Sequence, residues 1–237
     1  MPKSKNIFLV TGASTGIGKA ISKKLCIENN EVVLVSSSSK KLDIIKNEFL
    51  DLGFNFHIIK CDVSIEKQVE RMYSEAIEIG DVNCVINNAG IGIFSKINEM
   101  KVSDWDRQMG INLRGSFLVT KKFSNPMIDR KKGMLVFVNS VAGMKPYPYS
   151  SGYVSSKYGL RGFASSIREE FREYNIKVVS IHPGAVNTPF WDDIKGNFPK
   201  NEMLTSEDVA ETIYHAITAP NSSVIEEVLV RRNLGDF

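Results

Sequence analysis

The sequence predicts an α/β fold in which a doubly wound parallel sheet of about seven strands carries helices on both faces. Two observations support it. Short β-branched runs alternate with longer segments whose apolar residues recur at helical spacing. Several of the short runs, such as VVLV at 32–35, are almost wholly apolar. A strand with apolar residues on both sides must be covered on both faces, as in a parallel sheet with helical crossovers.

The pattern assigns each segment to one element. The expected strands are 6–10, 31–35, 55–60, 83–87, 134–139, 177–182 and 224–230. The expected helices are 17–28, 40–51, 65–79, 104–130, 154–174 and 206–218. The least regular stretch is 183–205, and its part at 189–205 is expected to be a substrate loop.

Length and composition indicate one ordinary globular domain covering 1–237. The 237 residues are 43% hydrophobic and 24% charged, and no repeat or linker divides them. The net charge of +3 is small and the lysines are scattered, which argues against nucleic acid as a partner. No apolar run is long enough for a signal peptide or a membrane span. The three cysteines lack metal-site spacing and are expected as buried free thiols in a cytoplasmic protein, with no metal.

Glycine spacing after the first expected strand indicates a phosphate site. The stretch TGASTGIG at 11–18 leads from that strand into a helix. Glycines permit a tight turn and close approach of backbone amides, and the helix N-terminus offers unpaired N–H groups and the positive end of its dipole. A dinucleotide pyrophosphate would fit there, although a glycine-rich turn that binds nothing remains the alternative. The candidate contacts are Gly12, Ser14, Thr15, Gly16, Ile17 and Gly18.

The stretch YVSSK at 153–157 contains a tyrosine and a lysine four residues apart. On a helix, Tyr153 and Lys157 would share one face. A neighbouring ammonium favours the phenolate, and lowering the phenol pKa from about 10 to about 7 requires roughly 4 kcal/mol. The pair could therefore exchange a proton with a substrate. The spacing alone fits an incidental pair on a solvated helix equally well.

Six motifs follow one another along the chain. They are TGASTGIG at 11–18, NNAG at 87–90, Asn112 in INL, Ser140 in NSVAG, YVSSK at 153–157 and HPGAVNT at 182–188. In this order and at these separations they resemble the short-chain dehydrogenase/reductase family, including the interval of 13 residues from Ser140 to Tyr153. The resemblance covers nearly the whole chain and implies a Rossmann-type fold.

The resemblance implies a catalytic set of Asn112, Ser140, Tyr153 and Lys157. Tyr153 would exchange a proton with the substrate oxygen, and Ser140, at the carboxyl edge of its strand, would hydrogen-bond that oxygen. Lys157 would also bind the nicotinamide ribose, and Asn112 would hold a water near the lysine.

The same resemblance implies a nicotinamide cofactor along this edge of the sheet, in contact with Tyr153 and Lys157. The further contacts are Asp62 and Val63 at the adenine, Asn88, Ala89 and Gly90 after the fourth strand, and Pro183, Gly184, Val186 and Thr188 after the sixth. Two of these have plain structural alternatives. Asp62 could cap the following helix, and Pro183 with Gly184 could form an ordinary turn.

The choice of cofactor depends on the stretch VSSSSKK at 35–41. In the family this end of the second strand meets the adenosine ribose. No acidic residue stands at Ser36 to repel a 2′-phosphate, and Ser36 and Ser37 could donate hydrogen bonds to one, with Lys40 or Lys41 nearby. NADP(H) is therefore favoured, NAD(H) stays possible, and the serines could also cap the next helix.

The expected function is hydride transfer between a nicotinamide and a carbonyl or secondary alcohol carbon of a small molecule. One alternative is a non-catalytic dinucleotide-binding sensor or scaffold of the same fold. Another is a sugar-nucleotide-modifying relative, for which the roughly 50 residues after Thr188 leave little room. The apolar residues Phe190, Trp191 and Phe198 suit a hydrophobic substrate or the packing of a lid. A homodimer or homotetramer is a further expectation from the family.

Overall fold

Seven parallel strands form one sheet in the computed structural model, which describes residues 6–192, 194 and 198–235. Their order is β3-β2-β1-β4-β5-β6-β7, so the chain winds outward in one direction from β1 and then in the other from β4. The bounds are β1 Ile7–Thr11, β2 Glu31–Ser36, β3 Phe56–Lys60, β4 Val82–Asn87, β5 Gly133–Val138, β6 Ile176–Pro183 and β7 Glu227–Val230. This confirms the predicted doubly wound α/β fold.

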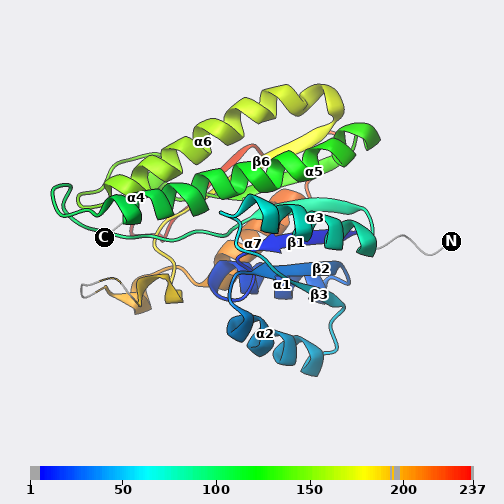
Figure 1. Cartoon of the computed structure of the whole chain (residues 1–237), viewed down its shortest axis with the longest axis horizontal. Helices are drawn as coiled ribbons and strands as arrows, with labels where there is room; N and C mark the ends of the chain where they lie inside the picture. Colours follow the sequence, from blue (N-terminus) through cyan, green and yellow to red (C-terminus); the bar gives the residue numbers. More distant parts are fainter. Residues whose placement is uncertain (1–5, 193, 195–197, 236–237) are drawn as a thin grey trace.

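Helices cover both faces of the sheet (Figure 1). The helices α3, α5 and α6 pack on one face and α1, α2 and α7 on the other. The bounds are α1 Gly16–Ile27, α2 Ser39–Asp51, α3 Glu66–Ile79, α4 Val102–Gln108, α5 Ser116–Arg130, α6 Ser151–Phe171 and α7 Ser206–Ile217. Each expected helix is thus present, with ends displaced by no more than a few residues.

The two helical layers explain the uninterrupted apolar runs in the central strands. Along β1, Leu9 faces the core beneath α3, α5 and α6, whereas Val10 faces the core beneath α1, α2 and α7. Both side chains are fully buried, as are Val33 and Leu34 in the neighbouring β2. Side chains that alternate between two cores must be apolar at every position.

The prediction of one continuous α-helix over 104–130 is wrong in one respect. A π-helical segment, Met109–Gly115, separates α4 from α5. Gly115 lies so close to the next layer that a Cβ there would be 2.7 Å from Cγ2 of Val63. Segments of this kind interrupt the regular i to i−4 ladder and are frequent at functional sites. This one contains Asn112.

The stretch at 183–205 is more regular than its sequence indicates. Short 3-10 turns occur at Pro189–Trp191 and Lys200–Glu202. A β-bridge joins Val186 to Leu204, so both ends of the expected substrate loop are fastened to each other. Residues 193 and 195–197 of that loop lie outside the described part of the chain.

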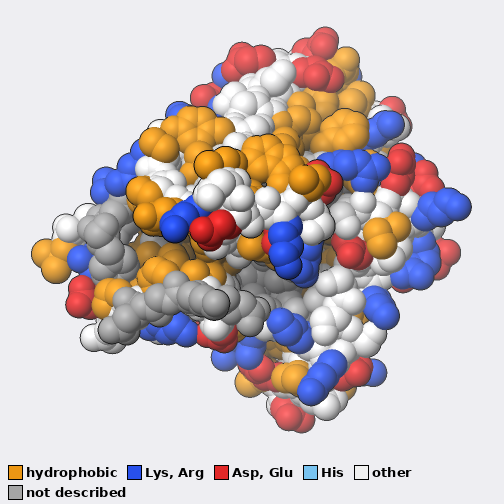
Figure 2. Space-filling model, turned by 60° about the vertical axis from the view of Figure 1, so that its left-hand side comes forward, with side chains coloured by type: hydrophobic (Ala, Val, Ile, Leu, Met, Phe, Trp, Pro, Cys, Tyr) orange, Lys and Arg blue, Asp and Glu red, His pale blue; other side chains and the backbone are white. Residues whose placement is uncertain are grey.

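The surface and the thiols agree with the composition. Lys, Arg, Asp and Glu side chains are intermingled on the face shown in Figure 2, with no basic stripe across it. Among the described residues, no helix combines the length and apolar character needed to cross a membrane. Cys26, Cys61 and Cys84 are buried free thiols, as predicted.

Candidate active site

The turns after β1 and β4 are locked together at the carboxyl edge of the sheet. Oγ1 of Thr11 accepts hydrogen bonds from the backbone amides of Asn88 (3.0 Å) and Ala89 (3.1 Å). Nδ2 of Asn88 donates to the carbonyls of Thr11 (2.9 Å) and Gly12 (3.2 Å). Asn88 therefore fixes the glycine-rich turn in place through its side chain, a role that the sequence analysis did not assign to it. The site lies where the strand order reverses, which is where open α/β sheets bind ligands.

The glycine-rich turn has the shape and the donors that a pyrophosphate requires. Gly12 and Gly16 have φ values of +65° and +53°, which disfavour a side chain. A Cβ on Gly18 would lie 2.3 Å from the carbonyl oxygen of Gly12, so α1 begins directly against the turn. Thr15, at the N-cap, makes no capping hydrogen bond with its side chain, which leaves the first amides of α1 open to a ligand. Ser14, Thr15 and Ile17 are partly exposed along this turn. The residues present thus fit an anionic dinucleotide.

Two residues of the serine run at the end of β2, Ser36 and Ser38, make different contacts. Oγ of Ser36 lies 2.9 Å from Oγ of Ser14, so the turns after β1 and β2 meet there. Ser38 is the residue that caps α2, accepting a hydrogen bond from the amide of Lys41 (3.3 Å). Ser36 is buried whereas Ser37 is exposed. The capping expected of the serines therefore falls to Ser38, and Ser36 remains at the predicted ribose position.

The turn after β3 is rigid for its own reasons. Oδ1 of Asp62 accepts hydrogen bonds from the amide (3.0 Å) and the hydroxyl (2.7 Å) of Ser64. The N-cap of α3 is Ile65, so the alternative in which Asp62 caps this helix is not realised. Val63 is buried. These contacts fix the backbone at the position where the adenine is expected.

Ser140, Tyr153 and Lys157 come together as the motif spacing predicts. The side chain of Ser140 is the hydrogen-bonding neighbour of the Tyr153 phenol that acts on the phenol pKa. Nζ of Lys157 donates to the carbonyl of Val138 (3.0 Å) and lies 5.7 Å from the centre of the Tyr153 ring. Tyr153 and Lys157 occupy the first turns of α6, one turn apart on the same side, while Ser140 follows β5.

Burial dominates the ionisation of this cluster. It raises the pKa of Tyr153 to about 12, and the hydrogen bond from Ser140 opposes the rise. Burial also lowers the pKa of Lys157 to about 8. The expected lowering of the phenol pKa by the lysine is thus not found when only the protein's own groups act: burial raises this pKa, and the one opposing influence is Ser140. At neutral pH these groups hold Tyr153 as a neutral phenol, ready to donate a proton.

Asn112 uses its whole side-chain amide inside the protein. Oδ1 accepts from the amide of Ile91 (2.8 Å), and Nδ2 donates to the carbonyl of Ile91 (2.9 Å) and to Oγ of Ser156 (2.9 Å). A Cβ on Gly90 would lie 3.4 Å from Oδ1 of Asn112 and 3.7 Å from Nζ of Lys157. Asn112 is therefore beside the lysine, but its side chain holds the segment after β4.

The segment after β6 closes over the glycine-rich turn. The amide of Gly184 donates to the carbonyl of Val230 (2.8 Å), directly after Pro183 ends β6. Val186 is buried. Thr188 caps the following 3-10 turn, and its methyl group would be 3.1 Å from a Cβ on Gly16. The segments after β1 and β6 consequently lie close together at this edge of the sheet.

His182 is a buried neighbour of the cluster that the sequence analysis did not single out. Its Nδ1 lies 3.3 Å from the carbonyl oxygen of Ser140, and its Nε2 lies 3.8 Å from Oε1 of Glu227. Glu227 is paired with Arg161 of α6 through bonds of 3.1 and 2.9 Å. Burial lowers the pKa of His182, which favours a neutral ring that donates to the carbonyl of Ser140. The motif HPGAVNT contained this residue, but only the cross-strand contact shows what it touches.

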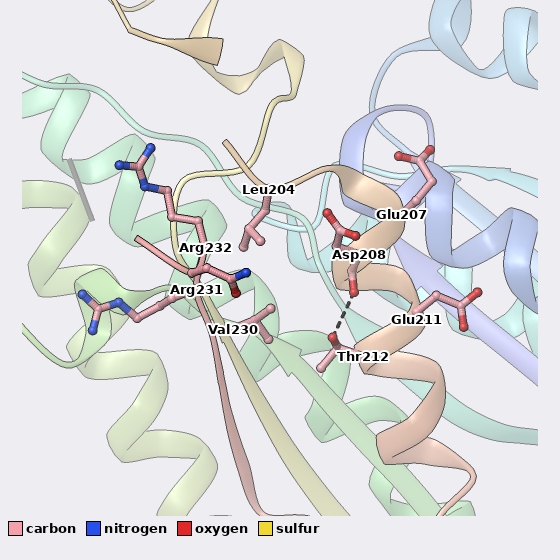
Figure 3. Close-up of a pocket in the computed structure, with 9 residues that line it drawn as sticks. Leu204, Glu207, Asp208, Glu211, Thr212, Val230, Arg231 and Arg232 are labelled. Atoms are coloured by element: carbon pink, nitrogen blue, oxygen red, sulfur yellow. Dashed lines mark hydrogen bonds between the residues drawn. The ribbon is translucent and has the colours of Figure 1, made fainter. Parts of the chain in front are cut away.

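A separate depression of about 580 Å³ lies between α7 and the segment after β7 (Figure 3). In Figure 3 the carboxylates of Glu207, Asp208 and Glu211 project from α7, and Arg231 and Arg232 belong to the segment after β7. Two of these carboxylates have structural partners. Asp208 closes a capping box with Thr205, and Glu211 pairs with Lys24 at 2.8 Å. This depression contains none of the expected catalytic residues.

With the sheet, the glycine-rich turn and the Ser140, Tyr153 and Lys157 cluster in view, comparison with known proteins identifies the class. The family model described as short chain dehydrogenase matches residues 6–197. The chain therefore belongs to the short-chain dehydrogenase family and is an oxidoreductase by membership.

Similar proteins extend over the whole chain. The sepiapterin reductase of Chlorobaculum tepidum is 33% identical over 98% of this chain and 98% of its own. An alcohol dehydrogenase of Thermococcus sibiricus, solved in complex with 5-hydroxy-NADP, has a TM-score of 0.89 and 27% identity over 97% of each chain. A metagenomic short-chain oxidoreductase in complex with NADP has a TM-score of 0.84 and 29% identity over 96% of this chain and 97% of its own.

Proposed function

We propose that this protein is an NADP(H)-dependent oxidoreductase that reduces a carbonyl group of a small molecule or oxidises the matching secondary alcohol. The observation that carries the proposal is the grouping of Ser140, Tyr153 and Lys157 at the carboxyl edge of the sheet, near the point where the strand order reverses. The whole chain, 1–237, acts as one domain in this proposal, with 189–205 as its substrate loop.

The proton transfer is assigned to Tyr153. The nicotinamide supplies or accepts the hydride when it is bound. Tyr153 donates its phenolic proton to the oxygen that gains charge as a carbonyl is reduced, and Ser140 hydrogen-bonds the same oxygen. The raised phenol pKa suits this direction, because a neutral phenol is the form that donates. In the reverse direction, the positive charge of Lys157 and of an oxidised nicotinamide would lower the phenol pKa.

Lys157 and Asn112 support the reacting pair. The Lys157 ammonium would hold the nicotinamide ribose as well as its present partner, the carbonyl of Val138. Asn112 keeps its backbone near the lysine, and a water held there would return a proton to the cluster after each turnover. Its amide side chain also fixes the segment after β4, where Asn88, Ala89 and Gly90 are expected to approach the cofactor.

NADP(H) is proposed over NAD(H). Solved relatives that contain NADP support this choice, as does the absence of an acidic residue in VSSSSKK at 35–41. The cofactor would extend along the residues named in the sequence analysis, from Asp62 and Val63 at the adenine to Val186 and Thr188 at the nicotinamide. The family also supports assembly as a homodimer or homotetramer, and buried thiols support a reducing compartment such as the cytoplasm.

The two alternatives have less support. A sensor or scaffold would not require Ser140 and Tyr153 to be brought together beside Lys157. A sugar-nucleotide-modifying enzyme has less support because the relative that matches this chain over 98% of both lengths is a sepiapterin reductase.

The test is a panel of ketones and aldehydes, including sepiapterin, assayed at 340 nm with NADPH and with NADH. Wild-type protein should consume NADPH with at least one compound. The Tyr153→Phe variant lacks only the hydroxyl group that donates the proton, so its kcat should fall at least about 100-fold. It should bind NADPH as tightly as wild type. Activity of Tyr153→Phe within tenfold of wild type would exclude the assigned role of the phenol.

A further inference from the structure

Three aromatic rings from three different elements meet at the catalytic phenol. Phe94 lies in the segment after β4, Tyr153 on α6 and Phe190 in the 3-10 turn after β6. The ring centres of Phe94 and Phe190 are each 5.6 Å from that of Tyr153. They are 6.2 Å from each other, with their planes at 75°. We call Phe94 and Phe190 the aromatic pair.

Phe94 is held by its chain neighbours. The amide of Ile93 donates to Oε1 of Gln108 (2.9 Å), and the amide of Ser95 donates to the carbonyl of Tyr149 (2.9 Å). Two residues earlier, Ile91 is bonded through both its amide and its carbonyl to Asn112. The backbone on either side of Phe94 is thus fixed to the helical layer that also carries Tyr153.

Phe190 is positioned by contacts within the segment after β6. Its amide donates to Oγ1 of Thr188 (3.3 Å). The indole of Trp191 donates to the carbonyl of Val186 (2.9 Å) and packs edge-on against the Phe190 ring, 5.5 Å between centres. Because both members of the aromatic pair are positioned by hydrogen-bonded backbone, their place beside Tyr153 does not depend on the two rings alone.

A glycine provides the space for both rings. A Cβ on Gly92 would lie 2.3 Å from Cζ of Phe190 and 2.9 Å from Cζ of Phe94. The backbone of Gly92 lies outside the positive φ region, so an alanine would be accepted by the chain and refused only by the two rings. The positions of both rings therefore depend on the absence of a side chain at Gly92.

We propose that the aromatic pair makes this enzyme selective for carbonyl compounds that carry a flat unsaturated ring near the reacting carbon. The inference rests on the proposed function, because it takes Tyr153 as the proton donor to that carbonyl. Ring pairs in edge-to-face or offset geometry gain about 0.5–1.5 kcal/mol beyond the area they bury. A saturated ring of the same size gains only the area. Two such walls beside Tyr153 should favour an aryl over a cyclohexyl substituent.

The experiment compares benzylacetone with its cyclohexyl analogue, two ketones whose carbonyl groups are electronically alike. The measured quantity is the ratio of their kcat/KM values with NADPH. Wild type should prefer benzylacetone, and Phe94→Leu and Phe190→Leu, which keep an apolar side chain, should each lower the ratio about fivefold. Intrinsic reactivity cancels, because every variant meets the same two ketones.

The matched control is Phe198→Leu. Phe198 packs on Trp191, 4.6 Å between ring centres, and is two rings further from Tyr153 than Phe190 is. Its loss should leave the ratio within twofold of wild type. Gly92→Ala should lower the ratio as the leucine variants do, although it removes neither ring. An equal ratio in wild type and in both leucine variants would overturn the proposal, as would an equal fall in Phe198→Leu.

A binding measurement separates this inference from the proposed function. Isothermal titration of benzylacetone and its analogue into Tyr153→Phe saturated with NADPH gives a ratio of dissociation constants that needs no turnover. Adding Phe94→Leu or Phe190→Leu to that background should lower the preference about fivefold. If the preference falls but no ketone is reduced by wild type, hydride transfer is wrong and the aromatic pair stands. If ketones are reduced but neither ratio changes, or if neither ring compound binds, the aromatic pair is not the selective element.

Discussion

At the scale of single residues, environment decides what each group can do. A tyrosine and a lysine four residues apart are compatible with phenolate formation, yet burial raises the pKa of Tyr153 to about 12 and lowers that of Lys157 to about 8. Spacing could be read from the sequence, whereas the desolvation of both groups depends on the layers packed over them. A charge that arrives with the cofactor would act on a phenol that the protein alone keeps neutral.

The cofactor preference can be tested at Ser36. Its Oγ is 2.9 Å from that of Ser14, so Ser36 faces the glycine-rich turn. Because a 2′-phosphate is expected at this end of β2, the carboxylate of Ser36→Asp would lie close to it. Repulsion between two anions at this partly screened site should lower the NADPH-to-NADH ratio of kcat/KM by about 10- to 100-fold. The uncharged variant Ser36→Asn has nearly the same size and should change the ratio by less than about fivefold. If wild type prefers NADH by more than tenfold, or if Ser36→Asp and Ser36→Asn change the ratio equally, then no 2′-phosphate is bound at Ser36.

At the scale of elements, the alternation of strand and helix was readable because each element has its own apolar period. All seven strands and the helical segments lie within a few residues of their expected positions. The π-helical segment Met109–Gly115 could not be predicted from an apolar period, because it depends on contacts between layers such as the one between Gly115 and Val63. Phe94 was missed for a related reason. A phenylalanine in an irregular segment belongs to no period, and only the fold brings it to Tyr153.

The π-helical segment should stabilise the turn after β4 through Asn112. In Asn112→Asp, the acceptor for the amide of Ile91 remains, but both donors to Ile91 and Ser156 are lost and a carboxylate faces a buried carbonyl. The free energy of unfolding should fall by about 2–4 kcal/mol in urea titrations. Ser156→Ala removes the acceptor for Asn112 and the bond that its own hydroxyl donates to the carbonyl of Tyr153 (2.7 Å), and should cost about 1–2 kcal/mol. If the two variants lose equal stability, the bonds to Ile91 contribute nothing.

At the scale of the whole molecule, the catalytic edge is joined to the last strand of the sheet. His182 bridges from the carbonyl of Ser140 toward Glu227 of β7, and Glu227 is held by Arg161 of α6. One buried imidazole therefore lies between the segment after β5 and Glu227, the first residue of β7. Its neighbours Glu227, Arg161 and Lys157 carry charges of both signs, and burial is the largest influence on its pKa.

This imidazole should make the fold sensitive to mild acid. Burial places the pKa of His182 in the folded protein below its ordinary value of 6.5, so the unfolded chain binds more protons as the pH falls through 6.5. The free energy of unfolding must then decrease below that pH, with a slope of at most about 1.4 kcal/mol per pH unit. Carboxyl groups whose pKa is lowered, such as Glu227 and Asp208, act only below their ordinary values of 4.5 and 3.8. The interval from pH 6.5 to 5 therefore lies above the range in which these two carboxyl groups act.

Urea titrations across that interval provide the measurement. Wild type should lose stability between pH 6.5 and 5, by at most about 2 kcal/mol. His182→Asn keeps a donor toward the carbonyl of Ser140 but cannot be protonated, so its free energy of unfolding should lose less than half as much. The exposed His215 serves as the control, since His215→Asn leaves the buried imidazole in place and should follow the wild-type slope. A wild-type stability that is flat from pH 6.5 to 5, or a slope that disappears in His215→Asn instead, would show that His182 is not the group whose protonation opposes folding.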